Sequence, residues 1–167
     1  MNIKPTQNEK TFKDSEILVT KTDLKGNITY VNRNFLRIIE ADEYDIIGKP
    51  HNVIRHPDMP KIIFKYLWTY LQSDKEIHAY VKNLCLDGSY YWVLANVSPS
   101  HNPSTNKVIG YHSARRLPTK EALEIIIPLY KQLLQAERMG GISASEKIMN
   151  NLLKEKGVAY DEFILSF

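Results

Sequence analysis

Apolar and polar positions alternate in five stretches of the chain, and a period of two residues is typical of half-buried β-strands. The stretches are residues 17–22, 27–31, 77–86, 89–98 and 107–116. Asp87-Gly88 joins the two longest stretches and is a strong signal for a tight antiparallel hairpin. The pattern therefore predicts a sheet in which at least these two strands are antiparallel neighbours.

Between the second and third stretches, apolar residues recur every three or four positions, which predicts short amphipathic helices. These helices are expected to begin at Asn32, at about Glu43 and at Pro60, and the last one runs to about Ser73. Asn is a favoured N-cap, and Pro is well suited to a first helical position. Strands in separate blocks with helices inserted between them indicate an α+β fold with an antiparallel sheet.

The chain from residue 119 onward has the pattern of two further helices. Thr119 is a suitable cap for the first, Pro128 is expected to kink it, and Gly140-Gly141 is expected to end it. The second amphipathic stretch stops at Gly157, where a glycine favours the left-handed conformation that ends helices.

The first of these C-terminal helices carries a broad apolar stripe. It consists of Leu123, Ile126, Ile127, Tyr130, Leu133 and Leu134. Such a stripe must be buried against something. One interpretation is an interface with a partner protein, and the other is packing onto the domain's own sheet or in a homodimer.

Composition excludes several classes of protein. The chain has 167 residues, of which 43% are hydrophobic and 25% charged, and a net charge of +3. These values are typical of one soluble domain with an appendage. The basic residues are scattered, which argues against a nucleic-acid interface. The polar N-terminus and the lack of a long apolar stretch argue against a signal peptide and against direct membrane insertion, so we expect a cytoplasmic protein.

Asn83 is the first residue whose position suggests chemistry. In the strand 77–86 it shares a face with Ala79, Val81 and Cys85, so on a concave sheet face it is an amide in an apolar lining. An unpaired buried amide costs about 1–3 kcal/mol. Asn83 either makes a cross-strand or solvent contact, or pairs with a planar heterocycle that presents alternating donors and acceptors.

Arg55-His56-Pro57-Asp58 is the second candidate. The arginine can grip a phosphate or a carboxylate, although His-Pro-Asp is also ordinary turn chemistry. Cys85 is the single cysteine, which excludes an internal disulfide, and its apolar neighbours indicate a packing role. The sequence contains no metal-ligand spacing, nucleophile–base pair or phosphate-binding loop, so we expect no enzyme and no metal site.

Four segments together resemble a PAS domain, and in particular the FAD-binding PAS domain of bacterial aerotaxis (redox-taxis) receptors. The segments are TDLKGNITYVNRNF, GKPHNVIRHPDMP, VKNLCLDGSYYWVLANVSP and IGYHSARR. General PAS features are weak signals, whereas the unbroken PHNVIRHPDMP followed by VKN is specific. The resemblance covers residues 17–138.

The resemblance implies a five-stranded antiparallel sheet with short helices over one face, which clasps FAD, followed by a C-terminal helical extension. It divides the chain into a leader (1–16), a PAS sensor domain (17–118) and the extension (119–167). The positions that match residues associated with flavin binding in the family are Asn32, Arg55, His56, Asp58, Trp68, Asn83 and Arg115. The chain departs from the family at Ile77, where an aromatic residue that would contact the cofactor is common.

The resemblance also implies a function in energy taxis. The chain shows neither the membrane anchor nor the methyl-accepting region of a full receptor, so it resembles the soluble half of a split system. Its expected partner is the cytoplasmic region of a membrane chemoreceptor, docked at the inner membrane, with a homodimer through the PAS domain or the C-terminal helices as a further contact. Two alternatives are a cofactor-free PAS scaffold and a haem-binding gas sensor with a histidine ligand.

Overall fold

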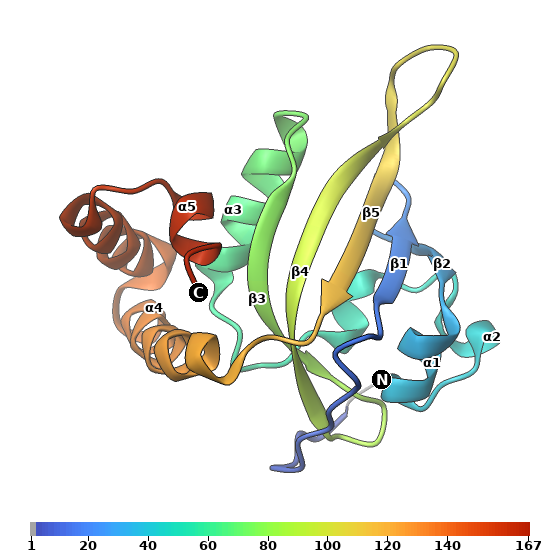
Figure 1. Cartoon of the computed structure of the whole chain (residues 1–167), viewed down its shortest axis with the longest axis horizontal. Helices are drawn as coiled ribbons and strands as arrows, with labels where there is room; N and C mark the ends of the chain where they lie inside the picture. Colours follow the sequence, from blue (N-terminus) through green and yellow to red (C-terminus); the bar gives the residue numbers. More distant parts are fainter. Residues whose placement is uncertain (1–2) are drawn as a thin grey trace.

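One five-stranded antiparallel sheet, of order β2-β1-β5-β4-β3, forms the centre of the computed structural model, which describes residues 3–167 (Figure 1). Its strands are β1 (Leu18–Thr22), β2 (Ile28–Val31), β3 (Ile77–Leu84), β4 (Tyr90–His101) and β5 (Val108–Arg116). All four neighbouring pairs are antiparallel, which confirms the predicted sheet.

The helices are α1 (Arg33–Ile39), α2 (Glu43–Ile46), the 3₁₀ turn η1 (His51–Ile54), α3 (Lys61–Gln72), α4 (Lys120–Lys156) and α5 (Tyr160–Ile164). Helices α1 to α4 follow the predicted order, whereas η1 and α5 were not predicted. Asn32 caps α1, since its Oδ1 accepts the Phe35 N–H at 3.0 Å. Thr119 caps α4 by accepting the Ala122 N–H at 3.1 Å. The α+β fold with an antiparallel sheet and a C-terminal helical extension is thus confirmed.

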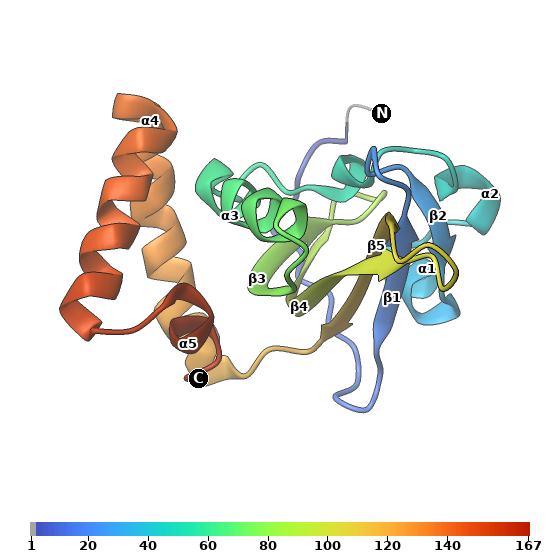
Figure 2. The same ribbon diagram turned by 90° about the horizontal axis from the view of Figure 1, so that it is seen from above.

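Helix α4 consists of two halves that meet at a sharp turn. Gly141 has φ 71° and ψ −170° and alone within α4 departs from helical dihedrals, so the helix breaks at the predicted Gly140-Gly141, whereas the kink predicted at Pro128 is not found. Gly157 ends the helix in the left-handed conformation, as predicted. The turn folds the second half of α4 back beside the first (Figure 2).

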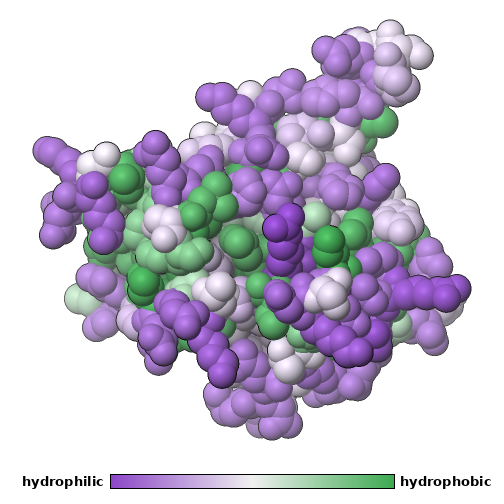
Figure 3. All heavy atoms as spheres, viewed as in Figure 1, coloured by the Kyte–Doolittle hydropathy of each residue, from purple (hydrophilic) through white to green (hydrophobic). Residues whose placement is uncertain are grey.

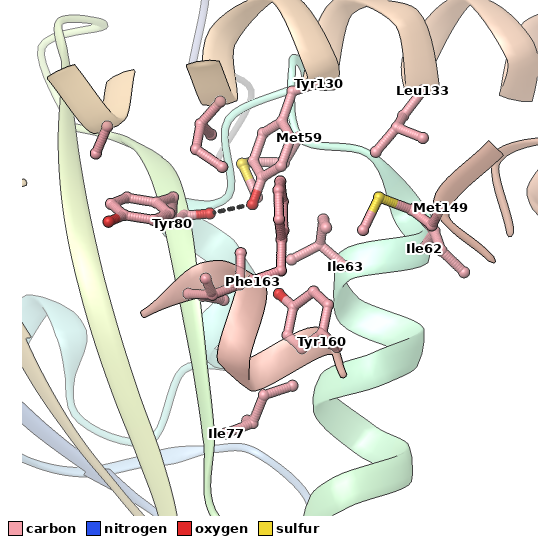
Figure 4. Packing of buried hydrophobic residues seen from close by; sticks show 14 of the residues in the cluster. Met59, Ile62, Ile63, Ile77, Tyr80, Tyr130, Leu133, Met149, Tyr160 and Phe163 are labelled. Carbon is pink, nitrogen blue, oxygen red and sulfur yellow. Dashed lines mark hydrogen bonds between the residues drawn. The ribbon is translucent and has the colours of Figure 1, made fainter. Parts of the chain in front are cut away.

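The C-terminal helices cover the β3 edge of the sheet and the outer side of α3 (Figures 1 and 2). Ile126, Tyr130 and Leu133 are buried together with Tyr160 and Phe163 of α5 (Figure 4). The predicted stripe therefore packs onto the domain's own sheet along these buried positions, and its apolar character no longer argues for a partner interface.

Backbone groups along the edge strand are paired with the helices that cover it. The Tyr130 hydroxyl donates to the Tyr80 carbonyl at 2.7 Å (Figure 4), and Asp161 of α5 accepts the His78 N–H at 3.4 Å. Exposed edge strands invite pairing with other chains, and a helix over the edge prevents it. The extension is thus an integral part of the domain.

The predicted leader is an extended segment across the described residues 3–16; its first two residues, 1–2, lie outside them. The Thr6 N–H donates to the Gly88 carbonyl at 2.8 Å, and the Lys10 N–H donates to the Tyr90 carbonyl at 2.7 Å. Phe12 is buried in the core cluster beneath α1. Backbone pairing with the hairpin, which a polar sequence does not reveal, holds the leader in place.

The surface seen in Figure 3 is mostly hydrophilic, and its hydrophobic side chains gather where the C-terminal helices meet the sheet. Leu165 and Ile125 contribute exposed apolar side chains to this part of the chain. Within residues 3–167, no helix has the length and apolar character needed to cross a bilayer.

Replacing Tyr130 by Phe should lower the free energy of unfolding by about 1 kcal/mol, because the Tyr80 carbonyl would lose its hydrogen-bond donor in a buried setting. Chemical denaturation of both proteins measures the difference. Tyr44→Phe is the matched control, since Tyr44 is exposed on α2 and should lose nothing. Equal stability of the two variants would mean that the hydrogen bond contributes nothing to covering the edge.

Candidate functional site

A cavity of about 270 Å³ lies between the sheet, η1 and α3. Its sheet wall is apolar at Val81, Ala95 and Val97, and α3 contributes Leu67 and Leu71 on the opposite side. Odd-numbered residues of β3 and β4 line this wall because side chains of a strand alternate between faces. The space is thus a slot with apolar walls on the sheet and on α3, as is common for small-molecule sites.

Arg115 provides the main polar feature of the cavity. Its side chain is 4% exposed, and its Nη2 donates to Thr20 Oγ1 at 2.9 Å and to His51 Nε2 at 2.7 Å. Strands β1 and β5 are neighbours, which brings Thr20 and Arg115 to one wall, and η1 brings His51 against them. Both hydrogen-bond partners are neutral, so the guanidinium charge has no carboxylate in contact with it.

The protonation states in this group follow from burial. Burial, together with the positive charge of Arg115, lowers the pKa of His51 to about 3, and burial lowers the pKa of Arg115 to about 10. At neutral pH a neutral imidazole therefore accepts a hydrogen bond from a charged guanidinium. A neutral His51 leaves the cavity wall with a net positive charge.

Within residues 3–167, three buried polar atoms of cavity-lining residues have no hydrogen-bond partner. They are Nδ2 of Asn83, Oγ of Ser113 and Nη1 of Arg115. Unsatisfied groups of this kind are rare in native proteins, because each costs about 1–3 kcal/mol. Three such groups around one cavity make it the candidate binding site.

Aromatic side chains border the cavity on its outer side. Trp68 of α3 is 38% exposed and packs edge-to-face against Tyr111 of β5, with 5.6 Å between ring centroids. Gly26, in the β1–β2 turn, has φ 82° and adjoins the indole ring. Trp68 and Tyr111 thus form an aromatic border at this side of the cavity.

Arg55 lines both this cavity and a second, larger hollow of about 1020 Å³. Its guanidinium carbon lies 3.8 Å from the centroid of the Phe64 ring, and its Nη2 lies 3.5 Å from the Met59 carbonyl. Pro50 and Asn52 line both spaces as well. The two spaces therefore adjoin each other at these three residues.

The structure places His56 and Asp58 outside the cavity. His56 Nδ1 accepts the Asp58 N–H at 3.1 Å, the His56 ring lies edge-on to Tyr90, and Asp58 pairs with Lys82 at 2.7 Å. These contacts fasten the loop after η1 to strands β3 and β4. Both residues thus hold the loop that carries Arg55, and His56 also borders the second hollow.

Asn32, Cys85 and Ile77 likewise lie away from the slot. Asn32 caps α1 and also accepts the Val19 N–H at 3.0 Å, so its amide is satisfied within the fold. Cys85 is buried under α1, and burial raises the pKa of its thiol to about 11, in keeping with a packing role. Ile77, at the position where the family commonly has an aromatic residue, is buried against the C-terminal helices and does not line the cavity.

Of the seven predicted site residues, the cavity brings together Arg55, Trp68, Asn83 and Arg115. Sequence reasoning missed Thr20, His51 and Ser113. Alternation along β5 places Ser113 on the same face as Arg115, so the strand pattern contained that signal. The contact between His51 and Arg115 joins residues 64 positions apart and leaves no trace in a single sequence.

Comparison with known proteins assigns this fold. Residues 28–115 match the sequence profile of the PAS fold. The chain belongs to the PAS family. It is also 36% identical to the aerotaxis receptor of Escherichia coli (strain K12) over 152 residues, which is 91% of this chain and 28% of the receptor. The PAS chain thus spans little more than a quarter of the length of that curated relative.

Solved structures agree on the fold. A light-oxygen-voltage domain studied with a flavin analogue superposes with a TM-score of 0.58 at 12% identity, covering 67% of this chain and 83% of that one. The PAS domain of a Colwellia psychrerythraea protein gives a TM-score of 0.56 at 20% identity, covering 62% and 87%. At these identities the likeness concerns the PAS fold alone.

Replacing His51 by Gln should make stability less dependent on pH between about 3 and 6.5. In the unfolded chain His51 takes up a proton below its ordinary pKa of 6.5, whereas in the folded protein it stays neutral down to about 3. Acidification through this window therefore favours unfolding, by up to about 1.4 kcal/mol per pH unit.

Urea titrations at several pH values measure this slope. The wild-type protein should lose stability more steeply than His51→Gln as pH falls from 6.5, with parallel curves above pH 7. Parallel curves throughout the window would show that the buried imidazole is not held neutral.

Proposed function

We propose that this PAS domain binds FAD in the cavity and reports its redox state to a chemotaxis receptor. The observation that carries the proposal is Arg115, a buried cation at the cavity wall whose hydrogen-bond partners are neutral. An uncompensated buried charge is costly. A ligand that becomes more negative on reduction would stabilise that charge, and flavins have this property.

The donors on the cavity wall fit the edge of a flavin ring. Asn83 offers an unpaired amide N–H group, Ser113 a hydroxyl and Arg115 a free guanidinium nitrogen. The pyrimidine part of an isoalloxazine presents alternating acceptors and donors, while its other rings are flat and apolar like the slot. The name of the 36% identical relative, an aerotaxis receptor, supports a sensor of the same kind.

The second hollow favours FAD over a smaller flavin. It shares Pro50, Asn52 and Arg55 with the cavity, and Lys49 and Lys61 line it as well. These three cationic side chains suit the phosphates of a dinucleotide. His56 and Asp58 would then act on FAD indirectly, by fixing the loop that positions Arg55.

When bound, FAD supplies reversible one- and two-electron transfer. The residues of the cavity make that transfer detectable by the protein. Arg115 lies where added negative charge is stabilised most, because burial strengthens its electrostatic interaction. Asn83 and Ser113 hold hydrogen-bond donors at fixed positions on β3 and β5, so a change in the proton pattern of the ring alters their preferred geometry. Only such differential contacts shift a conformational equilibrium.

The receiver in this proposal is the cytoplasmic region of a membrane chemoreceptor, present as a separate chain. The PAS protein would act without catalysis in the cytoplasm, docked at the inner membrane through that receptor, and in an assembly that includes a homodimer. The 36% identical relative, an aerotaxis receptor, supports the proposal that the signal passes to the chemotaxis system.

Purified protein should be yellow, with paired near-ultraviolet and blue absorption bands, and should release FAD on denaturation. Absorption spectroscopy and chromatography of the released cofactor measure this. A colourless protein that takes up no added FAD would point to a scaffold, and one intense band near 400 nm, roughly where haem absorbs, would point to a gas sensor.

Asn83→Ala should weaken FAD binding about tenfold or more while the fold survives, since one ring-edge hydrogen bond is lost. Fluorescence titration of FAD into apoprotein measures the affinity. Asn96→Ala is the matched control, because Asn96 is an amide on the neighbouring strand β4 whose contacts are to Glu76 and His78. Equal affinities in the two variants would place the ring elsewhere.

Arg115→Gln should make the two-electron midpoint potential of the bound flavin more negative by about 30 mV or more, since losing about 1.4 kcal/mol of preferential stabilisation corresponds to that shift. Spectroelectrochemical titration measures the potential. Arg116→Gln removes an exposed arginine at the next position of β5 and should leave the potential unchanged. An unchanged potential in Arg115→Gln would remove Arg115 from the redox response.

A further inference from the structure

Helix α3 lies beside the C-terminal helices (Figure 2) and also lines the cavity. One side of α3 contributes Phe64, Leu67, Trp68 and Leu71 to the cavity lining. The opposite side packs against α4 and α5, with Tyr66 and Tyr160 at 5.0 Å between ring centroids. Any displacement of α3 by a ligand therefore reaches the C-terminal helices directly.

The N-terminus of α3 has no cap of its own. Its N-cap is Pro60, which provides no side-chain hydrogen bond, and its first turn contains no acidic residue. Helix N-termini leave backbone N–H groups that need acceptors. Glu137 of α4 supplies them from 75 residues away, because its two carboxylate oxygens accept the N–H groups of Lys61 and Ile62, each at 2.9 Å.

The same carboxylate also joins the two halves of α4. The hydroxyl of Ser145, fully buried in the second half, lies 3.0 Å from Glu137 Oε1, across the turn at Gly141, and 2.9 Å from the Ile142 carbonyl, so its single proton is shared between two acceptors. Lys65 of α3 adds an ion pair with Glu146 at 2.8 Å. Three helical segments thus meet at one side chain.

The charge of Glu137 also acts on the ligand side. Glu137 and Arg55 both line the second hollow. Burial lowers the pKa of Arg55, and the negative charge of Glu137 opposes that effect, so the two groups interact electrostatically. An anion that engages Arg55 would compete with this attraction and alter the forces on Glu137.

We propose that Glu137 is a positioning residue that couples α3, and with it the occupancy of the cavity, to the two halves of α4 and to α5. The coupling between α3 and the two halves of α4 rests on the hydrogen bonds of Glu137 and requires no ligand. Its use in signalling rests on the proposed function, since the ligand that displaces α3 is taken to be FAD.

The first test uses the full chain without FAD and measures amide hydrogen exchange. Glu137→Gln keeps the shape of the side chain but replaces one accepting oxygen by an amide nitrogen. Exchange should become about fivefold faster at the start of α3 and also across residues 142–156. Ser145→Ala should accelerate exchange in 142–156 with a smaller effect on α3. Glu124→Gln, at an exposed glutamate of the same helix, is the matched control and should change neither region.

Faster exchange at α3 alone would overturn the proposal, because Glu137 would then be a simple helix cap. The second test adds saturating FAD. In the wild-type protein FAD should slow exchange in α3 and in residues 142–156, whereas in Glu137→Gln the protection of residues 142–156 should be lost. Equal protection of residues 142–156 in both proteins would also overturn it. Failure of the wild-type protein to take up FAD would instead contradict the proposed function, and the test without FAD would still decide the coupling.

Discussion

The buried guanidinium of Arg115 is the constraint on which the rest of the site depends. A charge removed from water must be compensated, yet the hydrogen bonds of Arg115 go to a threonine and a neutral histidine. Three elements of the fold, β1, β5 and η1, are held together at this point. Nη1 of the same group is buried and has no hydrogen-bond partner within residues 3–167. This incompletely compensated charge at the cavity wall is the basis of the proposal that a flavin binds there.

A second constraint is the covered edge of the sheet. Because α4 and α5 bury strand β3 and the outer side of α3, the C-terminal extension cannot move independently of the cavity wall. A PAS domain with a free extension would need a separate device to transmit a change in its ligand. Here the packing of the extension on α3 and β3 can transmit such a change. Glu137 adds hydrogen bonds that join α3 to both halves of α4. The apolar stripe of α4 is thus explained by internal packing, and the proposed contact with a receptor would need another surface.

Local patterns predicted most of the fold. Alternation located all five strands, Asn32 and Thr119 were correctly identified as caps, and Gly157 as the end of α4. The strand period also placed Asn83 on the concave face. Contacts between residues distant in sequence could not be predicted from a single sequence. The hydrogen bond between Arg115 and His51, and the binding of the leader to the hairpin, depend on residues distant in sequence. His56 and Asp58 show the converse limit, because a motif marks them as important without revealing that they fasten a loop.

The NMR signals of the Arg115 guanidinium protons test most directly whether this side chain contacts the proposed flavin. FAD titrated into ¹⁵N-arginine-labelled protein should shift the Arg115 side-chain resonances on binding, and reduction of the bound cofactor should shift them again, while the Arg116 resonances stay in place. Arg115 resonances that remain unchanged on both FAD addition and reduction would contradict the account.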